Sequence, residues 1–233
     1  MFRFKQFTVC DERSAMKIGT DGVLLGAWAD VEGDGRILDV GTGTGLIALM
    51  LAQRSADAEI VGIDISHEAI DEARDNFARS PWTTRLSAID GDVCSYESAD
   101  RFDHVVSNPP YFVDSLHSPD KLRTMARHTS SLKFEDLVAS AVRLLKPEGR
   151  LSVILPTECA MQFRFAAFGR LWLRRQTDVV TKEGDTPRRT LMEFCLSDKP
   201  LMPAITTLTM RHKDSTYTDE YRHLTEDFYI TLR

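Results

Sequence analysis

Short apolar runs alternate with amphipathic segments from residue 36 to residue 155. Runs rich in β-branched residues predict strands, whereas apolar positions spaced three or four residues apart predict helices. The predicted strands cover residues 36–40, 60–63, 86–89, 102–107 and 150–155, and the predicted helices cover residues 44–54, 66–79 and 134–145. This alternation is typical of a mostly parallel sheet with helices on both faces. It predicts an α/β fold that binds its ligands beyond the carboxyl ends of the strands.

The C-terminal part of the chain departs from this alternation. Residues 157–168 predict a helix with Thr157 as its N-cap. Two further strands are expected at residues 172–181 and 190–196, separated only by a polar loop. Strands that a loop joins without a helix pair antiparallel, so the sheet should contain an antiparallel C-terminal strand. An amphipathic helix over residues 217–230 is expected to close the chain.

The N-terminal part is expected to extend a single domain. Alternating apolar residues at Phe2 and Phe4 predict an edge strand, and a helix should begin at Thr20. The chain contains no internal repeat and no linker rich in proline, glycine or serine. The 233 residues therefore predict one domain made of an N-terminal extension (1–35), a central half (36–155) and a C-terminal half (156–233).

Composition places the chain among ordinary globular proteins. Hydrophobic residues make up 42% and charged residues 27%, which excludes disordered, collagen-like and low-complexity classes. The four cysteines form no CxxC pair, and the sequence has neither a signal peptide nor an apolar run of about 18 residues. We therefore expect a reduced, cytoplasmic protein with no zinc site, no membrane insertion and no metal.

The net charge of −6 hides a division of charge along the chain. Residues 11–110 carry 19 acidic and 8 basic side chains, whereas residues 111–233 carry 16 acidic and 19 basic side chains. Phosphate binding requires a basic surface, so the average alone argues against a nucleic-acid partner. The weakly basic C-terminal half is nevertheless compatible with a nucleic-acid partner.

A glycine-rich turn follows the first predicted strand. It has the pattern Asp39-x-Gly41-x-Gly43-x-Gly45. Glycines at such a turn let a ligand lie against the backbone and permit positive φ angles. The stretch from Gly43 to Ala48 also matches GxGxxA, a dinucleotide fingerprint. A nicotinamide or flavin cofactor and a plain tight turn are therefore alternatives.

Three acidic residues near strand ends narrow the kind of ligand. Asp64 ends the second predicted strand, 19 positions after Gly45, where an acid accepts hydrogen bonds from ribose hydroxyls. A carboxylate at Asp39 would repel a pyrophosphate, whereas it suits a positively charged ligand. Asp92, in Gly91-Asp92-Val93, is placed to accept a hydrogen bond from an exocyclic amine. Each acid could instead cap the helix that follows it.

The tetrapeptide Asn108-Pro109-Pro110-Tyr111 directly follows the fourth predicted strand. An exocyclic or amide nitrogen is a poor nucleophile because its lone pair is delocalised. If the Asn108 side-chain oxygen and the Pro109 carbonyl accept the two amino hydrogens, the nitrogen can direct its lone pair at a methyl carbon. Proline rigidity fixes these acceptors before the reaction, and Tyr111 can stack on a flat substrate. A rigid strand exit is the structural alternative.

The glycine turn and the acids after it resemble the Rossmann-like S-adenosylmethionine-dependent methyltransferases. The resemblance implies that the glycines line the methionine end of S-adenosylmethionine, with Asp39 near the ammonium group. Asp64 would hold the ribose, and Asp92 the adenine amine. The cofactor-binding residues implied are Asp39, Gly41, Gly43, Gly45, Asp64, Asp92 and Val93.

The tetrapeptide resembles the signature of methyltransferases that act on adenine N6, cytosine N4 or glutamine. Further segments make nearly the whole chain similar to the bacterial tRNA1(Val) adenine-N6-methyltransferases, which modify adenosine 37. These segments are residues 2–7, 16–28, 126–128, 189–194 and 217–232. By this resemblance the N-terminal extension covers the cofactor, with Lys17 and Thr20 near its methionine end.

The resemblance makes tRNA the expected partner, with no membrane and no obligatory protein partner. Basic side chains after the tetrapeptide and in the C-terminal half are candidates for RNA phosphates. They are Lys121, Arg123, Arg127, Lys133, Arg174, Arg175, Arg188 and Arg189. The alternative functions are an N5-glutamine methyltransferase that acts on a release factor, an NAD-dependent oxidoreductase and a non-catalytic RNA-binding module.

Overall fold

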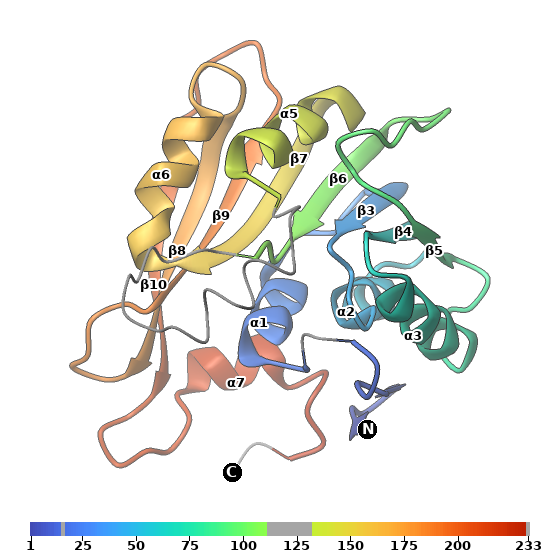
Figure 1. Cartoon of the computed structure of the whole chain (residues 1–233). Helices are drawn as coiled ribbons and strands as arrows, with labels where there is room; N and C mark the ends of the chain where they lie inside the picture. The colour runs from blue at the N-terminus through green and yellow to red at the C-terminus, as the bar shows by residue number, and fades with distance from the viewer. Residues whose placement is uncertain (15–16, 111–131, 232–233) are drawn as a thin grey trace, which may run out of the picture.

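The computed structural model describes residues 1–14, 17–110 and 132–231, which form an eight-stranded sheet with helices on both faces (Figure 1). The strands of this sheet are β3 (Arg36–Val40), β4 (Glu59–Asp64), β5 (Leu86–Asp90), β6 (Phe102–Ser107), β7 (Leu145–Pro156), β8 (Trp172–Lys182), β9 (Arg189–Cys195) and β10 (Ala204–Arg211). The helices are α1 (Thr20–Trp28), α2 (Leu46–Arg54), α3 (His67–Ala78), α5 (Phe134–Leu144), α6 (Thr157–Ala167) and α7 (Asp219–Thr225).

The strand order is β10-β8-β9-β7-β6-β3-β4-β5. Neighbouring strands run parallel except at β9, which is antiparallel to both β7 and β8. This confirms the predicted α/β class and the antiparallel strand. The sequence pattern missed β10, because the first four residues of this strand are all exposed and show no apolar alternation.

Two apolar clusters separate the layers. One joins the sheet to α1, α2, α3 and α7, and the other joins the opposite face to α5 and α6. Strand β3 contributes to both, because Ile37 packs in the first cluster whereas Leu38 and Val40 pack in the second. The same alternation turns Asp39 toward α2.

Helix α1 packs unusually close to α2. A Cβ added at Gly26 would lie 2.8 Å from the Cβ of Met50, and one added at Gly22 would lie 3.1 Å from Leu46 Cδ2. Residues 22–28 of this helix are all buried. Most of α1 is therefore core, and only its first turn reaches the edge of the sheet.

Several predicted boundaries were wrong. Helix α2 begins at Leu46 and not at residue 44, because Gly45 has a left-handed conformation. Thr157 is the first helical residue of α6, and Pro156 occupies the N-cap. The closing helix covers only Asp219–Thr225, with Thr218 as a cap whose hydroxyl accepts a hydrogen bond from the Tyr221 amide.

The N-terminal strand does not join the edge of the main sheet as predicted. Residues Phe2–Arg3 form β1, which pairs antiparallel with β2 (Thr8–Val9) in a separate two-stranded sheet. Phe4 and Phe7 are buried and their rings stack at 4.7 Å. Among the described residues, no helix is both long and apolar enough to cross a membrane.

We predict that Gly45→Ala destabilises the fold more than Gly33→Ala. Both glycines have left-handed backbones, with φ of +79° and +76°. A Cβ at Gly45 would also overlap the ring of Phe77, whereas a Cβ at Gly33 meets nothing within 4 Å. Urea denaturation should show losses of about 2–5 kcal/mol for Gly45→Ala and about 1–2 kcal/mol for Gly33→Ala. Equal losses would contradict the predicted overlap.

Candidate functional site

The register of the central strands places three chain segments side by side at the carboxyl edge of the sheet. Val40 at the end of β3 is level with Ile63 of β4 and with Ser107 of β6. The residues that follow, Gly41, Asp64 and Asn108, therefore leave the sheet together. The structure thus brings together the glycine turn, the predicted ribose acid and the start of the tetrapeptide.

Hydrogen bonds to β4 hold the glycine turn in place. The amides of Gly41 and Thr42 donate to the Ile63 carbonyl at 2.8 and 3.1 Å. The Gly43 amide donates to Asp64 Oδ2 at 2.9 Å. Gly41, with φ of +70°, is exposed, and a Cβ there would meet nothing within 4 Å. The turn therefore presents open backbone against which a ligand can lie.

Asp39 is a fully buried carboxylate beneath this turn. Its Oδ2 accepts hydrogen bonds from Thr42 Oγ1 at 2.7 Å and from the Ala48 amide at 3.3 Å. Its Oδ1 has no hydrogen-bond partner among the described residues. Burial raises the pKa of Asp39 to about 7, although the two hydrogen bonds oppose the shift. A cationic group nearby would favour its charged form.

The side chain of Thr42 needs the space that Gly62 leaves in β4. A Cβ added at Gly62 would lie 2.7 Å from Thr42 Oγ1 and 2.9 Å from its Cβ. The absence of a side chain at Gly62 thus allows the hydrogen bond between Thr42 and Asp39. The sequence signal for this residue is a single glycine inside an apolar strand, which our motif analysis did not use.

Asp64 is partly exposed and joins two turns. Its Oδ1 accepts a hydrogen bond from the Ser66 amide at 2.9 Å, while its Oδ2 binds the glycine turn. The next residue, Ile65, is 56% exposed. An exposed isoleucine beside the predicted ribose acid offers an apolar surface on which a base could pack. The sequence gives no sign of this role for Ile65, because an apolar residue at this position is equally expected at the end of a buried strand.

Asp92 and Val93 follow β5 in a short turn. Asp92 is exposed, and its Oδ1 accepts a hydrogen bond from the Cys94 amide at 2.9 Å, which closes a local turn and caps no helix, since β6 is the next element. Val93 is buried in the cluster beneath α5. The neighbouring Asp90, level with Asp64, binds His67 Nδ1 at 2.7 Å. The predicted adenine contact of Asp92 remains a prediction.

The tetrapeptide begins at the end of β6. The Ser107 hydroxyl donates to the Val40 carbonyl at 2.9 Å, which ties the strand exit to β3. Asn108 is half-buried, Pro109 is buried and Pro110 is exposed. Tyr111 lies outside the described residues. The first two residues therefore stand beside the glycine turn, as their predicted roles require.

The N-terminal candidates lie before α1. Lys17 is exposed, and its Nζ binds the carbonyls of Asp11 and Glu12. Thr20 is the first residue of α1. Asp21 in the same turn pairs with Arg189 Nε at 2.7 Å, which fixes this end of α1 to the start of β9. Arg189, level with Pro156, thus lies at the carboxyl edge of β7.

The predicted RNA-binding residues have different surroundings. Lys133 and Arg188 are exposed. Arg174 and Arg175 bind the buried carboxylate of Glu193 at 3.1 and 2.9 Å. The Arg175 guanidinium also lies over the ring of Trp28, 3.7 Å from its centre. Arg175 therefore has a structural role that sequence analysis did not foresee. Lys121, Arg123 and Arg127 lie outside the described residues.

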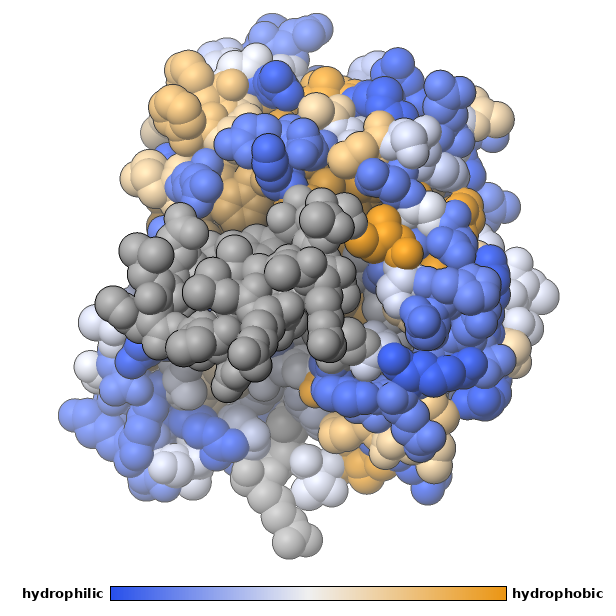
Figure 2. All heavy atoms as spheres, in the orientation of Figure 1, coloured by the Kyte–Doolittle hydropathy of each residue, from blue (hydrophilic) through white to orange (hydrophobic). Residues whose placement is uncertain are grey.

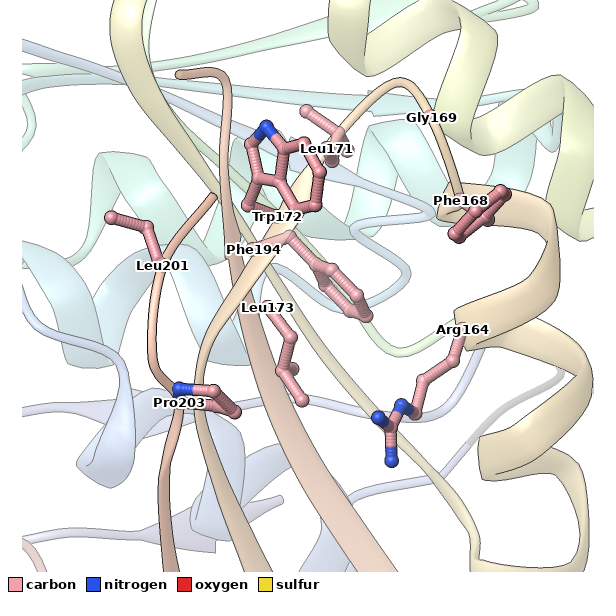
Figure 3. A pocket seen from close by; sticks show the side chains of 9 residues that line it. All are labelled: Arg164, Phe168, Gly169, Leu171, Trp172, Leu173, Phe194, Leu201 and Pro203. Atoms are coloured by element: carbon pink, nitrogen blue, oxygen red, sulfur yellow. The ribbon is translucent and has the colours of Figure 1, made fainter. Parts of the chain in front are cut away.

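A pocket on α6 and the neighbouring strands is separate from this site (Figure 3). Trp172 in the wall of this pocket pairs with Cys195 of β9, which in turn pairs with Arg150 in the middle of β7, away from the carboxyl end of that strand at Pro156. Figure 2 shows apolar side chains at the upper left, the region that α6 occupies in Figure 1. Phe165 of α6 and Phe168, its C-cap, are both largely exposed. No group of three histidine, cysteine or acidic side chains among the described residues could hold a metal ion.

The family model and the similar proteins of known name agree on the kind of protein this chain resembles. Residues 14–176 match the family described as methyltransferase small domain. A protein of Bacteroides thetaiotaomicron named tRNA1(Val) (adenine(37)-N6)-methyltransferase is 49% identical, over 100% of this chain and 98% of its own length. A protein of the same name from Phocaeicola vulgatus is 50% identical, over 99% and 98%.

Solved structures share the fold. A predicted O-methyltransferase of Agrobacterium tumefaciens aligns with a TM-score of 0.70 and 23% identity, over 92% of this chain and 99% of its own. A class I S-adenosylmethionine-dependent methyltransferase described as putative, from Listeria monocytogenes, aligns with a TM-score of 0.60 and 17% identity, over 88% and 65%. At these identities the likeness shows a Rossmann-like methyltransferase fold and no particular substrate.

We predict that Asp39→Asn changes the pH dependence of stability. Below about pH 4 the Asp39 carboxyl is protonated in both the folded and the unfolded chain. The contribution of this protonated group to the free energy of unfolding is then fully present. Between about pH 4 and 7 the unfolded chain ionises first, so this contribution is lost as the pH rises to the folded-state pKa of about 7.

The free energy of unfolding of Asp39→Asn, relative to the wild type, should therefore rise from pH 4 to pH 7 and then level off. Urea denaturation at several pH values measures this difference. Asp57→Asn, at an exposed position, is the control. A difference for Asp39→Asn that does not vary with pH would show that the folded carboxyl titrates normally.

Proposed function

Because the chain belongs to the tRNA1(Val) (adenine(37)-N6)-methyltransferase family, we propose that it methylates N6 of adenosine 37 in tRNA with S-adenosylmethionine. The observation that carries this proposal is the strand register that sets Asn108 beside Gly41. Methyl transfer requires the amine and the methyl donor in contact. Here the predicted amine-binding residues and the predicted cofactor turn leave neighbouring strands at the same level.

The residues around the glycine turn fit S-adenosylmethionine, which supplies a methyl group from its positively charged sulfonium when bound. Oδ1 of Asp39, which has no hydrogen-bond partner among the described residues, is a buried acceptor suited to a cationic ligand. Open backbone at Gly41 lets the ligand approach closely, and the partly exposed Asp64 offers its carboxylate to ribose hydroxyls. Ile65 gives the adenine base of the cofactor an apolar surface to pack against.

The same proposal assigns the other predicted cofactor residues. Gly43 and Gly45 shape the turn, while Asp92 and Val93 stand where the adenine ends. Lys17 and Thr20 belong to the segment that covers the methionine end. In this assignment the acidic side chains at the carboxyl edge attract a ligand with two positive groups.

Asn108 and Pro109 would activate the adenine amine. The side-chain oxygen of Asn108 and the backbone carbonyl of Pro109 accept hydrogen bonds from the two N–H groups of the adenine amine. The nitrogen lone pair is then free to point toward the methyl group. Because Pro109 is buried and cannot rotate about φ, the acceptors need no reorganisation when the amine arrives. The nitrogen loses its proton after transfer, so no strong general base is required. Tyr111 would stack on the extruded adenine.

The tRNA body would contact basic residues outside the methyl-transfer site. The described candidates at or near the surface are Lys133, Arg174, Arg188 and Arg189, of which Arg174 also binds Glu193 and Arg189 also pairs with Asp21. We further propose that the protein works in the cytoplasm on free tRNA. The names of the relatives specify adenine and give no support to a glutamine substrate, an oxidoreductase or a non-catalytic module.

Incubation with labelled S-adenosylmethionine and tRNA that lacks the modification should test the substrate. N6-methyladenosine should appear at position 37 of one tRNA species, as measured by nucleoside analysis of the isolated tRNA. A release factor incubated in parallel should remain unlabelled. Label in the release factor and none in tRNA would replace the proposed substrate with a protein glutamine.

Asn108→Ala should remove methyl transfer but leave cofactor binding intact. Loss of one fixed acceptor at the reacting amine should lower kcat by about 100-fold or more. Calorimetry with S-adenosylhomocysteine should give an affinity within about two-fold of the wild type, because Asp39, Asp64 and the glycine turn are unchanged. Asp57→Ala, at an exposed position between α2 and β4 outside the predicted site, is the control. Retained turnover in Asn108→Ala would exclude the proposed activation.

A further inference from the structure

A buried glutamate on α3 binds the N-terminal segment in a way that the methyl-transfer mechanism does not explain. Glu72 is 1% exposed. Its Oε1 accepts hydrogen bonds from the backbone amides of Glu12 and Arg13 at 2.7 and 2.9 Å, and its Oε2 accepts one from the Ser14 amide at 2.8 Å. Three successive amides thus converge on one carboxylate, an arrangement of strong, charge-assisted hydrogen bonds.

Asn76, one helical turn after Glu72, joins the same segment to the glycine turn. Its Oδ1 accepts a hydrogen bond from the Cys10 amide at 2.9 Å. Its Nδ2 donates to the Cys10 carbonyl and to the Thr44 carbonyl, both at 2.9 Å. Ser14 also lies against this turn, because its Oγ is 3.5 Å from the place of a Cβ on Gly43.

Apolar packing does not hold this part of the N-terminal segment. Phe4, Phe7 and Val9 anchor the preceding residues in the core, whereas residues 10–13 are all half-buried or exposed. The ion pair between Arg13 and Asp75 is exposed on both sides and contributes little. We call residues 10–14 the strap. Glu72 and Asn76 supply its hydrogen bonds to α3, while Lys17 binds the carbonyls of Asp11 and Glu12 within the N-terminal segment itself.

We propose that Glu72 and Asn76 are positioning residues that dock the strap on the glycine turn and so make the cofactor site competent. This inference rests on the proposed function, because it assigns the site to S-adenosylmethionine. Both residues act through backbone groups, and neither has to touch the cofactor. When the strap is docked, Ser14 lies against Gly43, and Asn76 links Cys10 to Thr44.

The proposal makes strap docking and cofactor binding mutually supportive. If only the docked form binds well, the apparent dissociation constant is the intrinsic one divided by the docked fraction. The cofactor in turn shifts the strap toward the docked form. Glu72→Gln keeps the volume but replaces one acceptor oxygen with an amide group that faces backbone N–H donors.

Calorimetry on Glu72→Gln with S-adenosylhomocysteine should show affinity about ten-fold weaker than the wild type, since the docked fraction falls. The KM for S-adenosylmethionine should rise equally, while kcat at saturating cofactor stays within about two-fold. Trypsin should cut after Arg13 at least several-fold faster. Asp71→Asn is the control, because Asp71 precedes Glu72 on α3 but contacts His67 and Arg74. Wild-type affinity and cleavage in Glu72→Gln would overturn the proposal, as would a fall in kcat without a rise in KM.

The wild-type protein gives a test that does not depend on the folding of a variant. Saturating S-adenosylhomocysteine should slow tryptic cleavage after Arg13 by about ten-fold. Cleavage at an unchanged rate, with the ligand shown by calorimetry to be bound, would overturn the strap proposal and leave the proposed function standing. If the wild type binds no S-adenosylhomocysteine, the cofactor assignment itself fails.

Discussion

The parallel register of β3 with β4 and β6 is the constraint on which the site depends. Val40 is level with Ile63 on one side and with Ser107 on the other, so the glycine turn, Asp64 at the end of β4 and the tetrapeptide lie together at this edge of the sheet. The Gly41 amide and the Ser107 hydroxyl each add a bond across these pairs. A shift of one residue along β3 would turn Asp39 away from α2 and toward the opposite layer.

Local sequence patterns predicted the elements that carry periodicity or a fixed motif. Alternating apolar runs gave β3 to β9 in the right order, and spacing placed Asp64 and Asn108 at strand ends. Patterns of this kind do not report contacts between distant segments. Nothing at Glu72 distinguishes a surface glutamate on an amphipathic helix from one that binds residues 12–14, and Arg175 resembles any solvated arginine until Trp28 and Glu193 surround it.

Two buried carboxylates show why net charge was a poor guide to function. Burial acts to raise the pKa of Glu193, but the hydrogen bond and charge of Arg175, with His104 and Arg150 nearby, hold this pKa below its usual range. The described hydrogen bonds to Asp39 come from neutral groups, the Thr42 hydroxyl and the Ala48 amide, and burial raises its pKa to about 7. The first carboxylate is compensated by the protein itself, whereas the second gains from a ligand that brings positive charge.

The position of β9 between β7 and β8 has a consequence for how the chain is built on the ribosome. β8 is synthesised before β9, yet its neighbours in the sheet are β9 and the still later β10. Until residue 195 has emerged, β7 presents an unpaired edge and β8 has no strand to join. The last three strands can therefore join the sheet only after β3 to β7 have been synthesised, and a nascent chain that stalls earlier leaves the edge of β7 able to pair with other chains.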